Sequence, residues 1–214
     1  MTPREPPSII VLAGTNGAGK SSVAGETFRE RGAVYFNPDE AARRILELKP
    51  WLGVEEANAR AWLAGKLRLE RAIAKRMGYI FETTLGGATI TALLEGAVDA
   101  GIPVRMWYVG LATPEHHLAR VRARVAAGGH DIPAAKVRER FDQSRKNLIR
   151  LLPALAELHL SDNTAEADPE TGQEPRPQVI LRMVDGTITE TAALAVVPTW
   201  AKPILVAAFR AYGI

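Results

Sequence analysis

Residues 8–22 read SIIVLAGTNGAGKSS, and this stretch decides the fold. The first six residues are an apolar run bounded by proline and glycine, which is typical of a short strand buried on both faces. Gly14–Ser21 then matches the pattern G-x-x-x-x-G-K-S/T at every fixed position, between this strand and a helix expected to about residue 31. The order of glycines differs from the dinucleotide pattern G-x-G-x-x-G, which argues against a Rossmann dehydrogenase. The stretch predicts a phosphate-binding loop.

Each residue type in this loop has a chemical reason. Glycines let the backbone wrap an anion so that successive N–H groups point at phosphate oxygens, and the helix N-terminus adds a partial positive charge. The Lys20 amine can reach the β- and γ-phosphates, and the Ser21 hydroxyl can ligate Mg²⁺. We therefore expect ATP and Mg²⁺ as cofactors, with the nucleotide held by Gly14, Thr15, Asn16, Gly17, Ala18, Gly19, Lys20, Ser21 and Ser22.

The composition excludes several other classes of protein. The formal charge is +3, from 27 Lys and Arg against 24 Asp and Glu, and this balance is too weak to indicate a nucleic-acid partner. The chain has no cysteine, which removes disulfides, thiol nucleophiles and Cys-ligated zinc. No run of 18 apolar residues occurs and the start does not read as a signal peptide, so we expect no membrane partner and a cytoplasmic location.

Strand and helix signals alternate along the rest of the chain. Strands are expected at 8–13, 33–36, 79–82, 103–111 and 155–160, and a hairpin is expected from 179–184 and 187–190 around Asp185-Gly186. Helices are expected between the strands, two of them at about 114–127 and 133–152. The pattern predicts an α/β fold of the P-loop NTPase type, with a mostly parallel sheet, helices on both faces and a C-terminal β-hairpin.

The class of P-loop protein follows from what else the sequence carries. It lacks the Asn-Lys-x-Asp stretch of switch GTPases, and its faint echo of a transporter signature at 84–88 directly follows a strand. Small-molecule kinases are compact and close an arginine-bearing lid over the transferring phosphate. Five arginines surround a Gly128-Gly129-His130 break, at positions 120, 122, 124, 138 and 140. We predict a single P-loop kinase domain over residues 1–214, with a helical lid at about 114–152.

Five motifs carry a family resemblance. AGTNGAGKSS, FNPDE, FETTL, RVRARVAAGGHDIP followed by VRERF, and SDN come in the same order as in zeta-toxin-like P-loop kinases, over about residues 8–165. The resemblance implies an ATP- and Mg²⁺-dependent phosphotransferase with an alcohol group as acceptor. It implies that this hydroxyl belongs to a nucleotide-linked small molecule such as a UDP-N-acetyl sugar. It also implies an antitoxin protein as partner.

The resemblance assigns catalytic roles to residues of this chain. Asp39 is implied as the general base that takes the proton of the acceptor hydroxyl; the alternative is that Asn37, Pro38 and two acids only form a well-made helix start. Two lid arginines are implied to neutralise charge on the transferring phosphate. They match Arg124 and Arg138, with Arg120 and Arg140 as alternatives.

Other residues are implied to contact the acceptor or the metal. Glu82 and Thr84 match a Glu-x-Thr pattern that binds the acceptor, and Glu82 at a strand end is equally a candidate to order Mg²⁺. His130 in the break either contacts phosphate or caps the turn. Asp162-Asn163 either meets the adenine or forms a turn.

We expect surface or core roles for the remaining candidates. His116 and His117 are adjacent and cannot both face one ligand on a helix, so both are interpreted as surface residues. Trp62 and Trp107 are interpreted as core residues. Three alternative functions stay open: a metabolic nucleotide kinase, a polynucleotide-end kinase, and a non-catalytic ATP-binding regulatory module.

Overall fold

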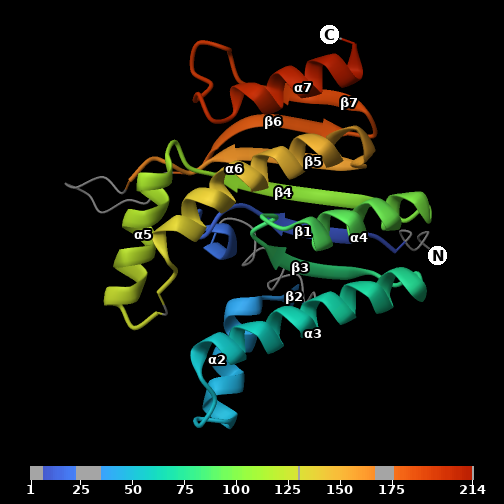
Figure 1. Ribbon diagram of the computed structural model, residues 1–214. Coiled ribbons are helices and arrows are strands. Elements are labelled where there is room, and N and C mark those ends of the chain that lie inside the picture. The colour runs from blue at the N-terminus through green and yellow to red at the C-terminus, as the bar shows by residue number, and fades with distance from the viewer. Residues whose placement is uncertain (1–6, 23–34, 130, 167–175, 214) are drawn as a thin grey trace.

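The computed structural model of the protein describes residues 7–22, 35–129, 131–166 and 176–213. Its centre is a seven-stranded sheet with strand order β2-β3-β1-β4-β5-β6-β7 (Figure 1). The first five strands in chain order pair in parallel, whereas β6 and β7 each pair antiparallel with the preceding strand. The strands are β1 (Ile9–Ala13), β2 (Tyr35–Phe36), β3 (Tyr79–Thr83), β4 (Val104–Gly110), β5 (Glu157–Asp162), β6 (Gln178–Val184) and β7 (Thr187–Thr191).

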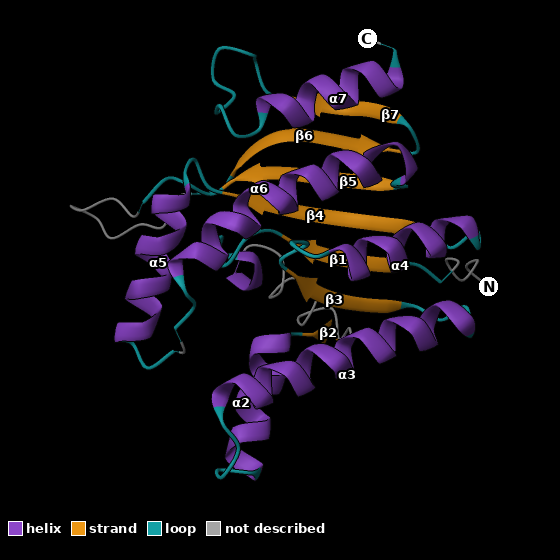
Figure 2. Cartoon of the chain, in the orientation of Figure 1, coloured by secondary structure: helices purple, strands orange, loops and turns teal. Residues whose placement is uncertain are grey.

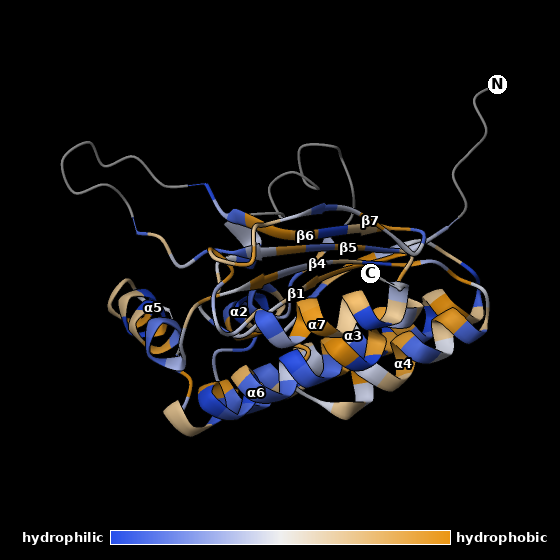
Figure 3. Ribbon diagram, turned by 90° about the horizontal axis from the view of Figure 1, so that it is seen from above, coloured by the Kyte–Doolittle hydropathy of each residue, from blue (hydrophilic) through white to orange (hydrophobic). Residues whose placement is uncertain are grey.

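Most helices in the described residues form a layer against the sheet, and two single helices lie outside this layer (Figure 2). Helices α3, α4, α6 and α7 lie over one face of the sheet, while α2 and α5 project beyond the carboxyl ends of the parallel strands (Figure 3). The helix expected between the phosphate loop and residue 31 falls largely outside the described residues. Bounds are α2 (Pro38–Leu48), α3 (Val54–Ala74), α4 (Ala88–Asp99), α5 (Pro114–Ala126), α6 (Ala134–Leu151) and α7 (Lys202–Tyr212), with a 3₁₀ turn η2 (Leu152–Ala154).

The main core lies between the sheet and its helical layer. Alternate residues of the central strand β1 point into it, and Ile10 and Leu12 point to the other face, where they pack with Trp107 and its neighbours. The strand is therefore apolar on both faces, as predicted from the run at 8–13. The prediction of a mostly parallel sheet with a C-terminal hairpin is confirmed. None of the helices in the described part of the chain combines the length and apolarity that a bilayer crossing needs.

The two helices predicted to form a lid, α5 and α6, differ in how they join the rest of the structure. The α5 helix and the start of α6 share a small core of their own, made by Leu118, Val121, Ile132 and Val137. Further along α6, Phe141, Leu148 and Leu151 belong to the main core. Helix α6 is thus anchored on the sheet from Phe141 onward, and it carries its first two turns and α5 past the sheet edge (Figure 1).

Candidate functional site

The phosphate loop leaves the carboxyl end of β1 in the conformation that its glycines permit. Gly14, Gly17 and Gly19 all have left-handed φ angles, of +139°, +81° and +82°. A Cβ on Gly14 would lie 2.1 Å from the carbonyl oxygen of Val109 on the neighbouring strand. A side chain at Gly14 would therefore be both strained and in collision, so this position requires glycine.

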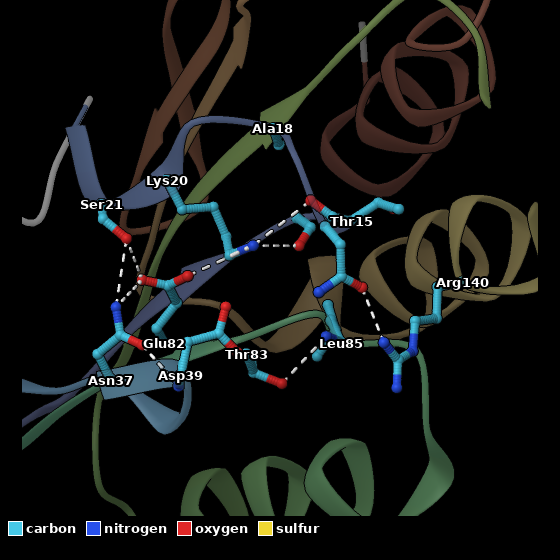
Figure 4. Close-up of polar contacts among 12 residues, drawn as sticks. Thr15, Ala18, Lys20, Ser21, Asn37, Asp39, Glu82, Thr83, Leu85 and Arg140 are labelled. Atoms are coloured by element: carbon cyan, nitrogen blue, oxygen red, sulfur yellow. Dashed lines mark hydrogen bonds and ion pairs between the residues drawn. The ribbon is translucent and has the colours of Figure 1, made fainter. Parts of the chain in front are cut away.

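Lys20 lies buried over this loop. Its Nζ donates to the carbonyl oxygen of Gly14 at 2.8 Å and to that of Thr15 at 3.4 Å, and it lies 3.5 Å from Oε1 of Glu82 (Figure 4). The side chain is only 6% exposed. A buried amine with an acidic partner at the end of β3 places positive charge beside the loop, where a terminal phosphate would lie.

Glu82 collects hydroxyl and amide groups around its second oxygen. Ser21 Oγ donates to Glu82 Oε2 at 2.8 Å, and the Tyr35 hydroxyl donates to the same atom. Asn37 Nδ2 donates to that oxygen at 3.2 Å and to Ser21 Oγ at 3.3 Å (Figure 4). The network joins the phosphate loop to the ends of β2 and β3.

Two oxygen groups of this network fit a Mg²⁺ ion as ligands. The Ser21 hydroxyl and the Glu82 carboxylate are hard oxygen ligands 2.8 Å apart, and Mg²⁺ prefers such ligands together with waters and substrate phosphates. In the described ranges no group of three or more His, Asp or Glu side chains could hold a metal. A Mg²⁺ held by one hydroxyl, one carboxylate and phosphate oxygens needs no such group.

Asp39 stands at the first turn of α2, between a helix cap and the lid. The Asn37 side chain accepts from the Asp39 and Glu40 amides at 2.8 and 3.3 Å, so the well-made helix start foreseen from the sequence is present. Asp39 Oδ2 also accepts from Arg124 Nη1 at 3.0 Å. Both side chains are a little over one third exposed. The Asn37 cap thus holds the Asp39 carboxylate toward Arg124 of α5. A capped helix start and a general base at Asp39 are therefore compatible interpretations of FNPDE.

The lid arginines point in different directions. Arg124 reaches Asp39, and Arg140 Nη1 donates to Asn16 Oδ1 on the phosphate loop at 2.8 Å. Burial lowers the pKa of Arg140, and the Asp39 carboxylate acts in the opposite direction. Arg138 is exposed and donates to Glu115 of α5 at 3.4 Å.

The structure therefore brings Arg140, and not Arg138, to the phosphate loop. Residues two apart on a helix point to nearly opposite sides, so only one of them can face the loop. Arg120 donates to the carbonyl oxygens of Asn163 and Ala165 at 2.7 and 3.1 Å, behind the loop. His130 lies outside the described residues.

A cavity of about 760 Å³ runs from the phosphate loop to α3. Glu82 and Thr84, the two residues of the Glu-x-Thr pattern, both line it. The turn after Thr84 is held by two hydrogen bonds to Leu85, whose amide donates to Thr83 Oγ1 at 3.0 Å and whose carbonyl accepts from Asn147 Nδ2 at 2.8 Å. The lining also includes Asn16, Lys20, Phe36, Asn37, Asp39, Asn58, Trp62, Lys66, Phe81, Ile90, Lys136, Glu139 and Arg140.

His117 contradicts its interpretation as a surface residue. Its side chain is 1% exposed, and its Nδ1 lies 2.8 Å from the carbonyl oxygen of Asn16. Because a carbonyl only accepts, Nδ1 carries the proton. Burial lowers the pKa of His117 to about 4, and the nearby charges of Lys20 and Arg120 act in the same direction. In the sequence, the position of His117 next to the apolar residue Leu118 on the buried side of α5 is the signal that indicates its burial.

The interpretation of Trp62 changes, and Asp162 takes one of the two roles left open for it. Trp62 is 46% exposed and lines the cavity, so it is not a core residue. Asp162 is buried and accepts from Trp200 Nε1 at 2.6 Å and from the Thr164 amide at 2.9 Å, so it forms the turn after β5. Asn163 Nδ2 donates to the carbonyl oxygen of Ala18 at 3.0 Å and so buttresses the phosphate loop.

Solved structures share this fold. A crystal structure of AvrRxo1-ORF1:-ORF2 with ATP matches with a TM-score of 0.65 at 15% identity, over 95% of this chain and 64% of that chain. The present chain therefore spans less than two thirds of that protein's length. The PezAT chromosomal toxin–antitoxin system of Streptococcus pneumoniae matches with a TM-score of 0.56 at 15% identity, over 74% of this chain and 68% of that chain. At such identities the likeness shows the fold alone, which is P-loop kinase-like.

Sequence comparison reaches a nearer relative. An uncharacterized protein of Haemophilus influenzae is 32% identical over 133 residues, which are 62% of this chain and 91% of that protein. A family model described as an AAA domain (AAA_33) matches residues 9–151, from β1 to the end of α6. The match covers more than half of the chain and includes the phosphate loop, Asp39, Glu82 and the lid arginines. The chain belongs to this AAA domain family.

Proposed function

We propose that the protein is a phosphotransferase that uses MgATP to phosphorylate a hydroxyl of a nucleotide-linked small molecule, in the manner of zeta toxins. One observation carries the proposal: Lys20, Asp39, Glu82 and Arg140 line a single cavity, and the lid residue Arg124 contacts Asp39 there. A non-catalytic nucleotide-binding module has no need of a carboxylate placed between the phosphate loop and the lid. The fold shared with a structure that holds ATP and with a toxin–antitoxin system supports the choice.

The phosphate loop binds the ATP triphosphate in this proposal. Lys20 turns from the Gly14 and Thr15 carbonyls to the β- and γ-phosphates. Ser21 and Glu82 would hold Mg²⁺, which would neutralise phosphate charge. Because Glu82 already lies 3.5 Å from Lys20 and 2.8 Å from Ser21, the ligands require little rearrangement.

Asp39 acts as the general base. Its carboxylate accepts the proton of the acceptor hydroxyl while that oxygen forms a bond to the γ-phosphorus and the bond to the β,γ-bridging oxygen breaks, which releases ADP. Arg124 leaves Asp39 for the transferring phosphoryl group, and Arg140 already lies beside the loop. The two guanidinium groups then offset the charge on the equatorial oxygens.

The acceptor lies between β3 and α3 in this proposal. Glu82 and Thr84 contact it near the reacting hydroxyl, where both line the cavity. An antitoxin protein is the proposed partner, because the matched PezAT structure is of a toxin–antitoxin system. The whole chain acts as one kinase domain, and the proposed location is the cytoplasm.

Phosphoryl transfer can be tested directly by mass spectrometry. Purified protein and MgATP are incubated with UDP-sugars, free nucleotides, NAD and a short oligonucleotide, and a product heavier by one phosphoryl group is sought. Lys20→Ala and Asp39→Asn are expected to abolish the product. Glu40→Gln is the matched control, since Glu40 is the next acid on the same turn and is exposed.

The outcomes separate the candidate functions. A phosphorylated oligonucleotide would favour the polynucleotide-end kinase, and a phosphorylated free nucleotide would favour the metabolic kinase. Normal transfer by Asp39→Asn would overturn the assignment of the base. ATP binding with no phosphorylated acceptor in the panel would count against the proposal and for the regulatory module.

A further inference from the structure

Helix α3 turns one chemically distinct face toward the cavity. Asn58, Trp62 and Lys66, spaced four residues apart, all line it. The other side of the helix packs against α2 through Ala57 and Ala61, both fully buried. Val54, Glu55, Ala59 and Gly65 of α3 line the cavity as well, so this face combines polar and charged groups, small residues and one indole. This is not a core-forming pattern.

Trp62 is the largest of these side chains and it is open to a ligand. It is 46% exposed while it lines the cavity, although burial of an indole is strongly favourable. Two small residues of α3 flank it. Ala59 lies one turn before, and Gly65 has no room for a side chain because a Cβ there would lie 2.6 Å from the ring of Phe36. A flat ring can therefore approach the indole.

The cavity is also larger than phosphoryl transfer alone requires. Its phosphate end holds Lys20, Asp39 and Glu82, and its far end holds Trp62 and Asn58. A volume of about 760 Å³ is within the range of sites that enclose a whole drug-sized ligand. The reacting hydroxyl occupies the first end, so the second end must recognise another part of the same acceptor.

We propose that the α3 face binds the nucleobase of the acceptor, stacked on Trp62 with its edge hydrogen-bonded by Asn58. An aromatic side chain stacks on any base, and a primary amide supplies both a donor and an acceptor to a base edge. Lys66 is held by Glu70 at 2.6 Å and plays no part in base recognition. The inference rests on the proposed function, because it names the acceptor part that the kinase would recognise.

Binding, rather than turnover, tests this site. With the ATP site saturated by a non-hydrolysable ATP analogue and Mg²⁺, calorimetry measures the affinity for UMP, CMP, AMP, GMP and the base-free ribose 5-phosphate. We expect wild-type protein to bind at least one nucleotide more tightly than ribose 5-phosphate. Trp62→Ala is expected to weaken that nucleotide about tenfold or more, and Trp62→Phe less, because phenylalanine still stacks. Asn58→Ala is expected to reduce discrimination among the bases.

Trp51 provides the matched control. It is 76% exposed on the turn before α3 and does not line the cavity, so Trp51→Ala is expected to bind like the wild type. The proposal is overturned if Trp62→Ala binds as tightly as the wild type. It is equally overturned if ribose 5-phosphate matches the nucleotides, or if no nucleotide binds beside the ATP analogue. Trp62-dependent binding without phosphoryl transfer would instead contradict the proposed function and leave the base site standing.

Discussion

Acid should weaken the fold through one buried imidazole. His117 has a pKa of about 4 in the folded protein against an ordinary value of 6.5. Between these values the unfolded chain binds the proton and the folded protein does not, so stability is lost as the pH falls from 6.5 to 4. Each pKa unit corresponds to about 1.4 kcal/mol, so the loss from this residue is about 3 kcal/mol. That is a large part of the stability of an ordinary domain.

Urea unfolding at several pH values isolates this effect. His117→Asn keeps a hydrogen-bond donor near the Asn16 carbonyl, but the asparagine cannot be protonated. The free energy of unfolding of this variant therefore lacks the pH dependence that His117 causes in the wild type. Carboxylates and the other histidines titrate in both proteins and cancel in the difference. We expect the variant to be less stable than the wild type at pH 7.5 and the gap to narrow toward pH 4. A gap that stays constant over that range would refute the assignment of a buried, neutral His117.

Two further predictions compare pairs of residues. Arg140→Ala is expected to lower the rate of phosphoryl transfer at least tenfold more than Arg138→Ala, because of these two arginines only Arg140 contacts the phosphate loop. The same mass-spectrometric assay measures both rates. The opposite order would restore Arg138 as the second arginine that contacts the transferring phosphate. Gly14→Ala is expected to destabilise the protein by more than about 2 kcal/mol, since the new Cβ would collide with the Val109 carbonyl oxygen. Gly96→Ala is expected to stabilise the protein by about 0.5–1 kcal/mol, because Gly96 lies inside α4 with open space where a Cβ would be. Thermal unfolding checks the pair, and equal shifts would contradict the reasoning.

The features that the sequence predicted well are those set by local chemistry. The hairpin between β6 and β7 is one example. Asp185 and Gly186 have φ angles of +46° and +72°, as a two-residue turn with both residues left-handed requires, and Asp-Gly is a preferred pair for it. The phosphate loop is another, because its glycines and Lys20 form a local unit directly after one strand.

The features that the sequence predicted poorly depend on distant packing. The predicted environments of His117 and Trp62 are wrong because burial on a helix is decided by what lies against it. For His117 the deciding neighbour is the phosphate loop, about a hundred residues earlier, and for Trp62 it is a cavity bordered by the strands β2 and β3 and by α6. Arg138 and Arg140 are chemically equivalent in the sequence. Only the phase at which α6 is anchored by Phe141 and Leu148 decides which of them faces the loop.

Asn16 links the phosphate loop to both α5 and α6. Its carbonyl accepts from His117 on α5, and its side chain accepts from Arg140 on α6. A trans peptide points its C=O and N–H in opposite directions, so fixing the Asn16 carbonyl also fixes the direction of the Gly17 N–H. A Cβ on Gly17 would lie 2.7 Å from the His117 carbonyl oxygen, so α5 approaches the loop as closely as glycine allows. Any movement that separates α5 from the loop must therefore break the hydrogen bond that orients this peptide, whose N–H is expected to bind phosphate.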